Sequence, residues 1–135
     1  MQSEVVLRKL DSLRRCLKRI EDKQPIDWEE ITTDYDLQDI LSINLERAVQ
    51  LAVDAGLQVL IVTGRKPPDS MSEVFLLLAD EKVISDSLAT NLRKAVGFRN
   101  ISVHDYQSID WKIVESIVTR HLHDFYRYIE VLTAL

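Results

Sequence analysis

The feature that most constrains this chain is a run of small and aliphatic residues between positions 37 and 62. They recur every three or four residues, at Leu37, Leu41, Leu45, Ala48, Ala52, Ala55, Val59 and Val62. This spacing places them on one face of an α-helix, and its persistence for about seven turns predicts a rod roughly 40 Å long. Such a rod can bury its apolar face only against other long elements, so it predicts the spine of a helical domain.

The middle of this helix is lined by small residues, which would let another helix approach closely: Ala48, Ala52, Ala55 and Gly56. Asn44 lies in the same apolar stripe, and a buried amide needs a partner. A hydrogen bond to a neighbouring helix is a better explanation of Asn44 than a role in a site. Thr33 or Asp34 is expected to cap the start of the helix. Gly64, followed by two prolines, is expected to end it in a left-handed conformation.

Helical spacing continues on both sides of the spine. An N-terminal helix is predicted to end near Lys23, before Pro25, with an apolar stripe of Val6, Leu10, Leu13, Leu17 and Ile20. Residues 26–34 are predicted to form a connector. Residues 71–82 form a short helix capped by Asp69 or Ser70. Residues 86–103 form another, capped by Ser85, with Leu88, Leu92, Val96 and Val103 pointing inward.

The last helix is predicted to begin at the cap Asp110, with Ile109 and Val114 as a hydrophobic staple. Its expected stripe is Val114, Val118, His121, Phe125, Tyr128 and Leu132. No stretch alternates with a period of two for long enough to predict a strand. The sequence therefore predicts an all-α bundle of about five helices in a single domain, residues 1–135.

Composition narrows the class of protein. The chain has 135 residues, 46% of them hydrophobic and 29% charged, as in ordinary globular domains. Its single cysteine, Cys16, excludes an intramolecular disulfide and favours a cytoplasmic location. No leader segment is evident, and the most apolar stretch is far shorter than the ~20 residues that span a membrane. We expect a cytoplasmic protein without a membrane partner.

The charge is unevenly distributed. The net charge is −5, yet residues 1–23 hold seven Lys and Arg against four acids, which gives +3 there and −8 in the remainder. A local basic face can bind phosphates on a protein that is acidic overall. Alternatively, it is a solvated helix face with i,i+4 pairs such as Glu4–Arg8 and Asp11–Arg15.

Histidines 121 and 123 resemble a pair of metal ligands. On a helix, residues two apart point about 200° from each other, so the two side chains are not expected to bind one ion. His121 falls on the apolar stripe and is predicted to be a hydrogen-bonded core or interface residue, whereas His123 faces water. We expect neither a metal site nor a cofactor.

The richest chemistry lies in residues 97–106, GFRNISVHDY, termed here the polar strip. Arg99 could hold a phosphate and offset charge that develops during its transfer. His104 could exchange protons near neutral pH, and Asn100 could orient the phosphate or the imidazole. This set suits metal-free cleavage of RNA, which supplies its own 2′-hydroxyl nucleophile. The alternative is a solvated helix end, with His104 favoured by the helix dipole.

Arg99 and His104 are five residues apart, about 140° around an unbroken helix. For the two to act together, the helix must end near Val103, or a second protomer must complete the site. A two-fold dimer would bring two copies of the polar strip together.

The polar strip resembles the R-x4-6-H motif of the HEPN superfamily, and more closely the R-x4-H-x-Y form of HepT-type toxins from HepT–MntA toxin–antitoxin pairs. The flanks NLERAVQLAVDAG, PPDSMSEVFLLLADEKVIS and DWKIVESIVTRHLHDFYRYIEVL resemble the same family. The resemblance covers about residues 35–132. The N-terminal helix resembles that of the family only in being a helix.

This resemblance implies a HEPN-like bundle that forms a two-fold homodimer, with both polar strips lining a shared cleft. It implies a metal-independent RNA endonuclease of a type VII system, with Arg99 holding the phosphate, His104 as general acid and base, and Asn100 in support. Cleavage would leave a 2′,3′-cyclic phosphate and a 5′-hydroxyl. An MntA-type nucleotidyltransferase antitoxin would neutralise the toxin by adenylylating Tyr106, because added phosphate and adenine would obstruct RNA.

Two alternatives to the enzyme stay open. One is a non-catalytic helical dimer that binds a nucleotidyltransferase partner or a nucleotide. The other is a structural bundle without a ligand.

Overall fold

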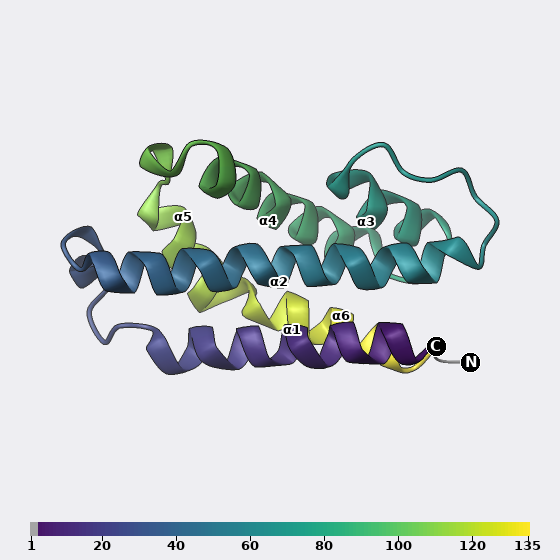
Figure 1. Cartoon of the computed structure of the whole chain (residues 1–135), viewed down its shortest axis with the longest axis horizontal. Helices are drawn as coiled ribbons and strands as arrows, with labels where there is room; N and C mark the ends of the chain where they lie inside the picture. The colour runs from purple at the N-terminus through teal and green to yellow at the C-terminus, as the bar shows by residue number, and fades with distance from the viewer. Residues whose placement is uncertain (1–2) are drawn as a thin grey trace.

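The computed structural model describes residues 3–135, and these are helical with short connections (Figure 1). The elements are α1 (Glu4–Lys23), η1 (Trp28–Thr32), α2 (Tyr35–Ile61), α3 (Met71–Asp80), α4 (Asp86–His104), η2 (Tyr106–Ser108), α5 (Trp111–Ser116), η3 (Ile117–His121) and α6 (Leu122–Thr133). Because α5, the π-helical segment η3 and α6 follow one another without a break, the described residues form five rods, as predicted. No helix within residues 3–135 is long and apolar enough to cross a membrane.

Helix α2 is the spine of the bundle and extends across the length of the molecule in Figure 1. Helix α1 packs along one side of it, while α3 and α4 lie along the other. Helix α6 contacts both α1 and α4, which closes the bundle. The buried face of α1 is the predicted stripe: Val6, Leu10, Leu13, Leu17 and Ile20.

The small residues in the middle of α2 do admit other helices, as predicted. A Cβ atom on Gly56 would lie 2.6 Å from the Tyr128 hydroxyl oxygen and 2.8 Å from Val74 Cγ1. Tyr128 is fully buried, donates a hydrogen bond to the Ala52 carbonyl at 2.7 Å, and packs edge-on against Phe75. Burial raises the pKa of the Tyr128 hydroxyl far above its ordinary value. This tyrosine is therefore a neutral, structural group.

The helix caps follow the sequence signals. Asp34 caps α2 by accepting a hydrogen bond from the Leu37 amide at 3.0 Å, and Ser70 caps α3. Ser85 and Asp110 cap α4 and α5 as expected. Gly64 takes the left-handed conformation after α2, with φ +73°.

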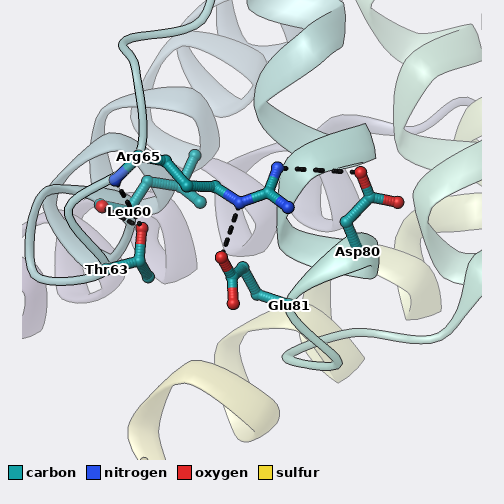
Figure 2. A network of polar contacts seen from close by, with 5 residues as sticks. All are labelled: Leu60, Thr63, Arg65, Asp80 and Glu81. Carbon is teal, nitrogen blue, oxygen red and sulfur yellow. Dashed lines mark hydrogen bonds and ion pairs between the residues drawn. The ribbon is translucent and has the colours of Figure 1, made fainter.

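The loop between α2 and α3 is attached to the end of α3 (Figure 2). Arg65 Nε donates to Glu81 Oε1 at 2.5 Å, and Arg65 Nη1 lies 3.7 Å from Asp80 Oδ2. The Thr63 hydroxyl donates to the Leu60 carbonyl at 2.7 Å, which satisfies an acceptor in the last turn of α2. These contacts hold α3 against the spine.

Three predictions need correction. The connector at residues 26–34 contains a short 3-10 helix, η1, whose Ile31 is buried. Asn44 is buried, but its amide donates to the Ile40 carbonyl of its own helix at 2.8 Å, so the predicted bond to another helix is wrong. Val103 is 47% exposed, because Ser102 takes the buried position in the last turn of α4 and the next residue points 100° away.

The last rod also departs from the predicted stripe. Segment η3 is a π-helix, which holds an additional residue in its turn. Leu122 therefore takes the buried position that had been assigned to His121, and the His121 side chain is 40% exposed. Val114, Val118, Phe125, Tyr128 and Leu132 are buried as predicted.

Candidate active site on the last turns of helix α4

The polar strip forms the end of α4 and the turn that follows. Helix α4 continues through His104, and the Asp105 amide donates to the Ile101 carbonyl at 2.8 Å. The chain then makes the single 3-10 turn η2, in which Ser108 Oγ donates to Asp105 Oδ2 at 2.5 Å. Ile109 is buried directly afterwards and fixes the turn on the core.

Arg99 is half-buried at the edge of α4 that faces α2. Its Nη2 atom lies 3.5 Å from Gln50 Oε1, and its Nη1 atom donates to Asn100 Oδ1 at 3.3 Å. Asn100 itself is exposed. Arg99 and Asn100 are thus brought together, and donors on the guanidinium remain free to hold a phosphate.

Contacts continue from Arg99 toward the basic N-terminal helix. Gln50 Nε2 donates to Asp54 Oδ1 at 2.9 Å, and Lys9 Nζ lies 3.5 Å from Asp54 Oδ2. Lys9, one of the cations in residues 1–23, is therefore linked to Arg99 through two side chains, those of Asp54 and Gln50. Elsewhere on α1, the predicted pair of Glu4 and Arg8 forms at 2.6 Å.

The predicted pair of Asp11 and Arg15 is wrong. Asp11 lies 3.4 Å from Arg14 instead, one position earlier on the helix surface.

His104 is the last residue of α4, and its side chain is exposed. Its imidazole makes no hydrogen bond to any other residue in the described part of the chain, which leaves both ring nitrogens open to a ligand. Because α4 is unbroken through His104, Arg99 and His104 point about 140° apart, and a single chain does not bring them together. Val103 and Asn100 occupy the helix surface between them, and both are exposed.

Tyr106 turns back from η2 onto the start of α2. Its hydroxyl donates to Asp39 Oδ1 at 2.7 Å, and its ring packs edge-on against Trp111 with centroids 6.1 Å apart. Partial burial and the bonded carboxylate of Asp39 raise the pKa of Tyr106, with a further contribution from Glu46. The residue is still 39% exposed, beside its carboxylate partner.

The α2 residues in contact with the polar strip were missed by the sequence analysis. Asp39 and Gln50 are eleven residues apart, about three turns, so they lie on the same side of α2, with Glu46 between them. The available signal was a polar stripe at positions 39, 46 and 50, flanking the apolar stripe of the spine.

The two C-terminal histidines lie closer together than predicted. Their rings stack with centroids 6.3 Å apart, and both contact the buried Asp124: His121 Nδ1 at 2.9 Å and His123 Nε2 at 3.4 Å. The predicted divergence of 200° was wrong because His121 ends the π-helical segment with non-helical backbone angles. Residues 3–135 contain no group of three or more His, Cys, Asp or Glu that could hold a metal ion.

A cavity of about 220 Å³ lies between α4, α5 and α6, away from the polar strip. Its walls include Lys94, Ile117, His121 and Phe125, and none of them is a strip residue. Arg99, Asn100 and His104 lie instead on the surface of the last turns of α4.

Comparison with known proteins identifies the family of this chain. The family model described as "Ribonuclease HepT-like" matches residues 13–132. The "mRNA nuclease HepT" of Shewanella oneidensis strain MR-1 is 35% identical over 132 residues, which cover 98% of each chain.

Solved structures extend the likeness to the whole fold. A Shewanella oneidensis HEPN toxin, described as tri-AMPylated and in complex with MNT antitoxin, superimposes with a TM-score of 0.92 at 34% identity, covering 99% of this chain and 100% of that one. The YutE protein of Bacillus subtilis shares the fold alone, with a TM-score of 0.82 at 16% identity over 96% of this chain and 86% of that one. With a family model spanning most of its length and a relative that aligns almost end to end, the chain belongs to the HepT-like ribonuclease family.

Proposed function

We propose that this chain is an RNA endonuclease toxin of a type VII toxin–antitoxin pair. The observation that supports it most is the presentation of Arg99, Asn100 and His104 on the exposed last turns of α4, in a chain of the HepT-like ribonuclease family. In this proposal Arg99 binds the scissile phosphate and offsets the charge that develops on it. His104 takes the proton of the 2′-hydroxyl and returns one to the leaving 5′-oxygen. Neither step uses a metal or a cofactor.

The active form is proposed to be a two-fold homodimer. Arg99 and His104 diverge by about 140° on one α4, so a second copy of the polar strip is the simplest way to complete the set. The exposed apolar side chains of Ile43 and Val103, which lie on α2 and α4, would be covered in such an interface.

Tyr106 is the proposed control point. Its exposed hydroxyl would be adenylylated by an MntA-type nucleotidyltransferase antitoxin, and the added phosphate would repel RNA next to His104. The similar toxin from Shewanella oneidensis, described as tri-AMPylated in complex with its antitoxin, supports this assignment. A cytoplasmic location also remains a prediction.

Cleavage of RNA in EDTA tests the nuclease. Purified chain with unmodified Tyr106 is incubated with an mRNA transcript and, separately, with total tRNA, and the new 3′ ends are mapped. His104→Ala should slow cleavage by about 10²- to 10⁴-fold, the usual contribution of a general acid or base. His123→Ala is the matched control, because His123 is also exposed but lies outside the polar strip.

Cyclic-phosphate ends from the wild type and from His123→Ala, but not from His104→Ala, are the expected result. Intact RNA in every lane would contradict the nuclease and favour the non-catalytic module that binds a nucleotidyltransferase or a nucleotide.

A further inference from the structure

The hydroxyl of Tyr106 is bound to a carboxylate from a distant part of the chain. Tyr106 and Asp39 are 67 positions apart, yet the hydroxyl donates to Asp39 Oδ1 at 2.7 Å. A hydrogen bond of this length is the contact that a nucleophilic hydroxyl makes with a general base before it reacts. Both side chains are exposed, so another molecule can reach this pair.

Two further contacts hold the tyrosine in this position. The Trp111 ring packs edge-on against the Tyr106 ring, and the 3-10 turn η2 fixes its backbone through the hydrogen bond between Ser108 and Asp105. Asp39 lies in the second turn of α2, next to Ser42, whose hydroxyl donates to the Asp39 carbonyl at 3.3 Å. The pair is therefore built on two rigid elements, α2 and the junction of η2 with α5.

We propose that Asp39 is the catalytic base for adenylylation of Tyr106, so that the toxin itself supplies a catalytic group for its own inactivation. This inference rests on the proposed function, in which a nucleotidyltransferase partner brings ATP to Tyr106. As the tyrosine oxygen attacks the α-phosphorus, the O–H bond breaks and its proton moves to Asp39 Oδ1. A phosphorus–oxygen bond forms to Tyr106, the bond from the α-phosphorus to the bridging oxygen breaks, and pyrophosphate leaves with that electron pair.

The carboxylate is separate from the groups proposed to cleave RNA. Asp39 lies about 16 Å along α2 from Gln50, the residue that contacts Arg99. Replacing Asp39 therefore leaves the contacts of Arg99 in place. A carboxylate beside Tyr106 also gives no help in binding RNA phosphates, whereas it can accept the proton of the hydroxyl that it binds.

The chain offers its own matched control. Tyr126 also donates a hydrogen bond to a carboxylate, that of Glu21, on the α1–α6 side of the bundle. Glu21→Gln removes a tyrosine-bound carboxylate outside the polar strip. Loss of charge by itself can thus be separated from loss of the base at Tyr106.

The experiment measures the rate of AMP transfer to Tyr106 by intact mass. Wild type, Asp39→Asn, Asp39→Glu and Glu21→Gln are each incubated with ATP and the purified nucleotidyltransferase antitoxin. Asparagine keeps an oxygen that can accept the tyrosine hydrogen bond but cannot take its proton, so Asp39→Asn should be modified about 100-fold more slowly or worse. Asp39→Glu should recover part of the rate, and Glu21→Gln should match the wild type. Thermal unfolding and antitoxin binding of each variant show that it is folded and still engages its partner.

Modification of Asp39→Asn at a rate within about threefold of the wild type would overturn the role of Asp39 and leave the proposed function intact. The absence of AMP on the wild type itself would overturn both. In cells, Asp39→Asn is expected to stay toxic when the antitoxin is co-expressed, whereas the wild type is neutralised.

Discussion

Two tyrosine hydroxyls donate hydrogen bonds to the same helix from opposite environments. Tyr128, from α6, bonds the Ala52 carbonyl in the middle of α2, where it is fully buried. Tyr106, from η2, bonds the Asp39 carboxylate near the start of α2, where it is 39% exposed. The donors are chemically identical, so the difference lies in the acceptors and in access to solvent.

A backbone carbonyl cannot accept a proton at any ordinary pH, whereas a carboxylate can. Burial keeps the Tyr128 hydroxyl neutral and makes it a means of joining α6 to α2. Tyr106 is partly exposed beside a potential proton acceptor, as its proposed modification requires. The comparison shows that the chemistry open to each tyrosine depends on its hydrogen-bond acceptor and its exposure to solvent.

The largest contrast is expected from truncating the two rings. Tyr128→Ala should lower the free energy of unfolding by about 3–5 kcal/mol, because it empties a fully buried aromatic position. Tyr106→Ala should cost only about 1 kcal/mol, since its ring is partly exposed. Urea denaturation of the unmodified proteins measures both. Equal losses would break the distinction between a structural and a functional tyrosine.

Substituting alanine for each of two helix glycines tests the close packing around Tyr128. In Gly56→Ala, the new methyl group would meet the Tyr128 hydroxyl at 2.6 Å, so we expect destabilisation of about 1–3 kcal/mol despite the better helix propensity of alanine. Gly97 of α4 has open space around its Cβ position, and Gly97→Ala should stabilise the protein by up to about 1 kcal/mol. Thermal unfolding of the pair tests opposite signs for the same substitution.

Removing only the hydroxyls should give a smaller effect. Tyr128→Phe is expected to cost about 1 kcal/mol, the net value of one hydrogen bond, and Tyr106→Phe less, because water can replace its partner. In an adenylylation assay the order reverses: Tyr106→Phe should take no AMP, while Tyr128→Phe is modified at the rate of the wild type. A modified Tyr106→Phe protein would show that the AMP site lies elsewhere.

A third tyrosine extends the comparison to alkaline pH. Partial burial and the bond to Glu21 raise the pKa of Tyr126 from 10.0 to about 12. Because the folded state holds this proton more tightly, the resulting stability is present below pH 10 and is lost as the pH rises from 10 to 12. The fall in the urea midpoint over that window should be smaller in Tyr126→Phe than in the wild type. If the urea midpoint of Tyr126→Phe falls as much as that of the wild type, the loss of stability at high pH comes from the other tyrosines.

Local signals in the sequence predicted the elements well. Asp34, Ser70, Ser85 and Asp110 all cap helices, because a cap depends on residues within three positions along the chain. The apolar stripe of α1 was predicted in full for a similar reason: helical periodicity is visible within a single segment.

Contacts between distant segments could not be derived in this way. Asp39 and Gln50 meet the polar strip across 67 and 49 positions, and no local pattern pairs them with Tyr106 and Arg99. The residues of the polar strip were singled out because their chemistry is unusual for a helix end and because the strip and its flanks resemble a known family. Their partners on α2 are ordinary polar residues of a solvent-facing flank.

The π-helical segment η3 fixes the rotational phase between the two halves of the last rod. Because this π-helical turn already holds one residue more than an α-helical turn, deleting one residue within 117–121 would restore an α-helical turn and keep α5 in phase with α6. Deleting one residue within 112–116, in the α-helical part, would instead turn Trp111 by about 100° relative to α6 and carry it away from the Tyr106 ring. The last rod can therefore lose a residue in η3 without disturbing the packing of Tyr106, whereas the same loss in α5 removes the ring that holds this tyrosine.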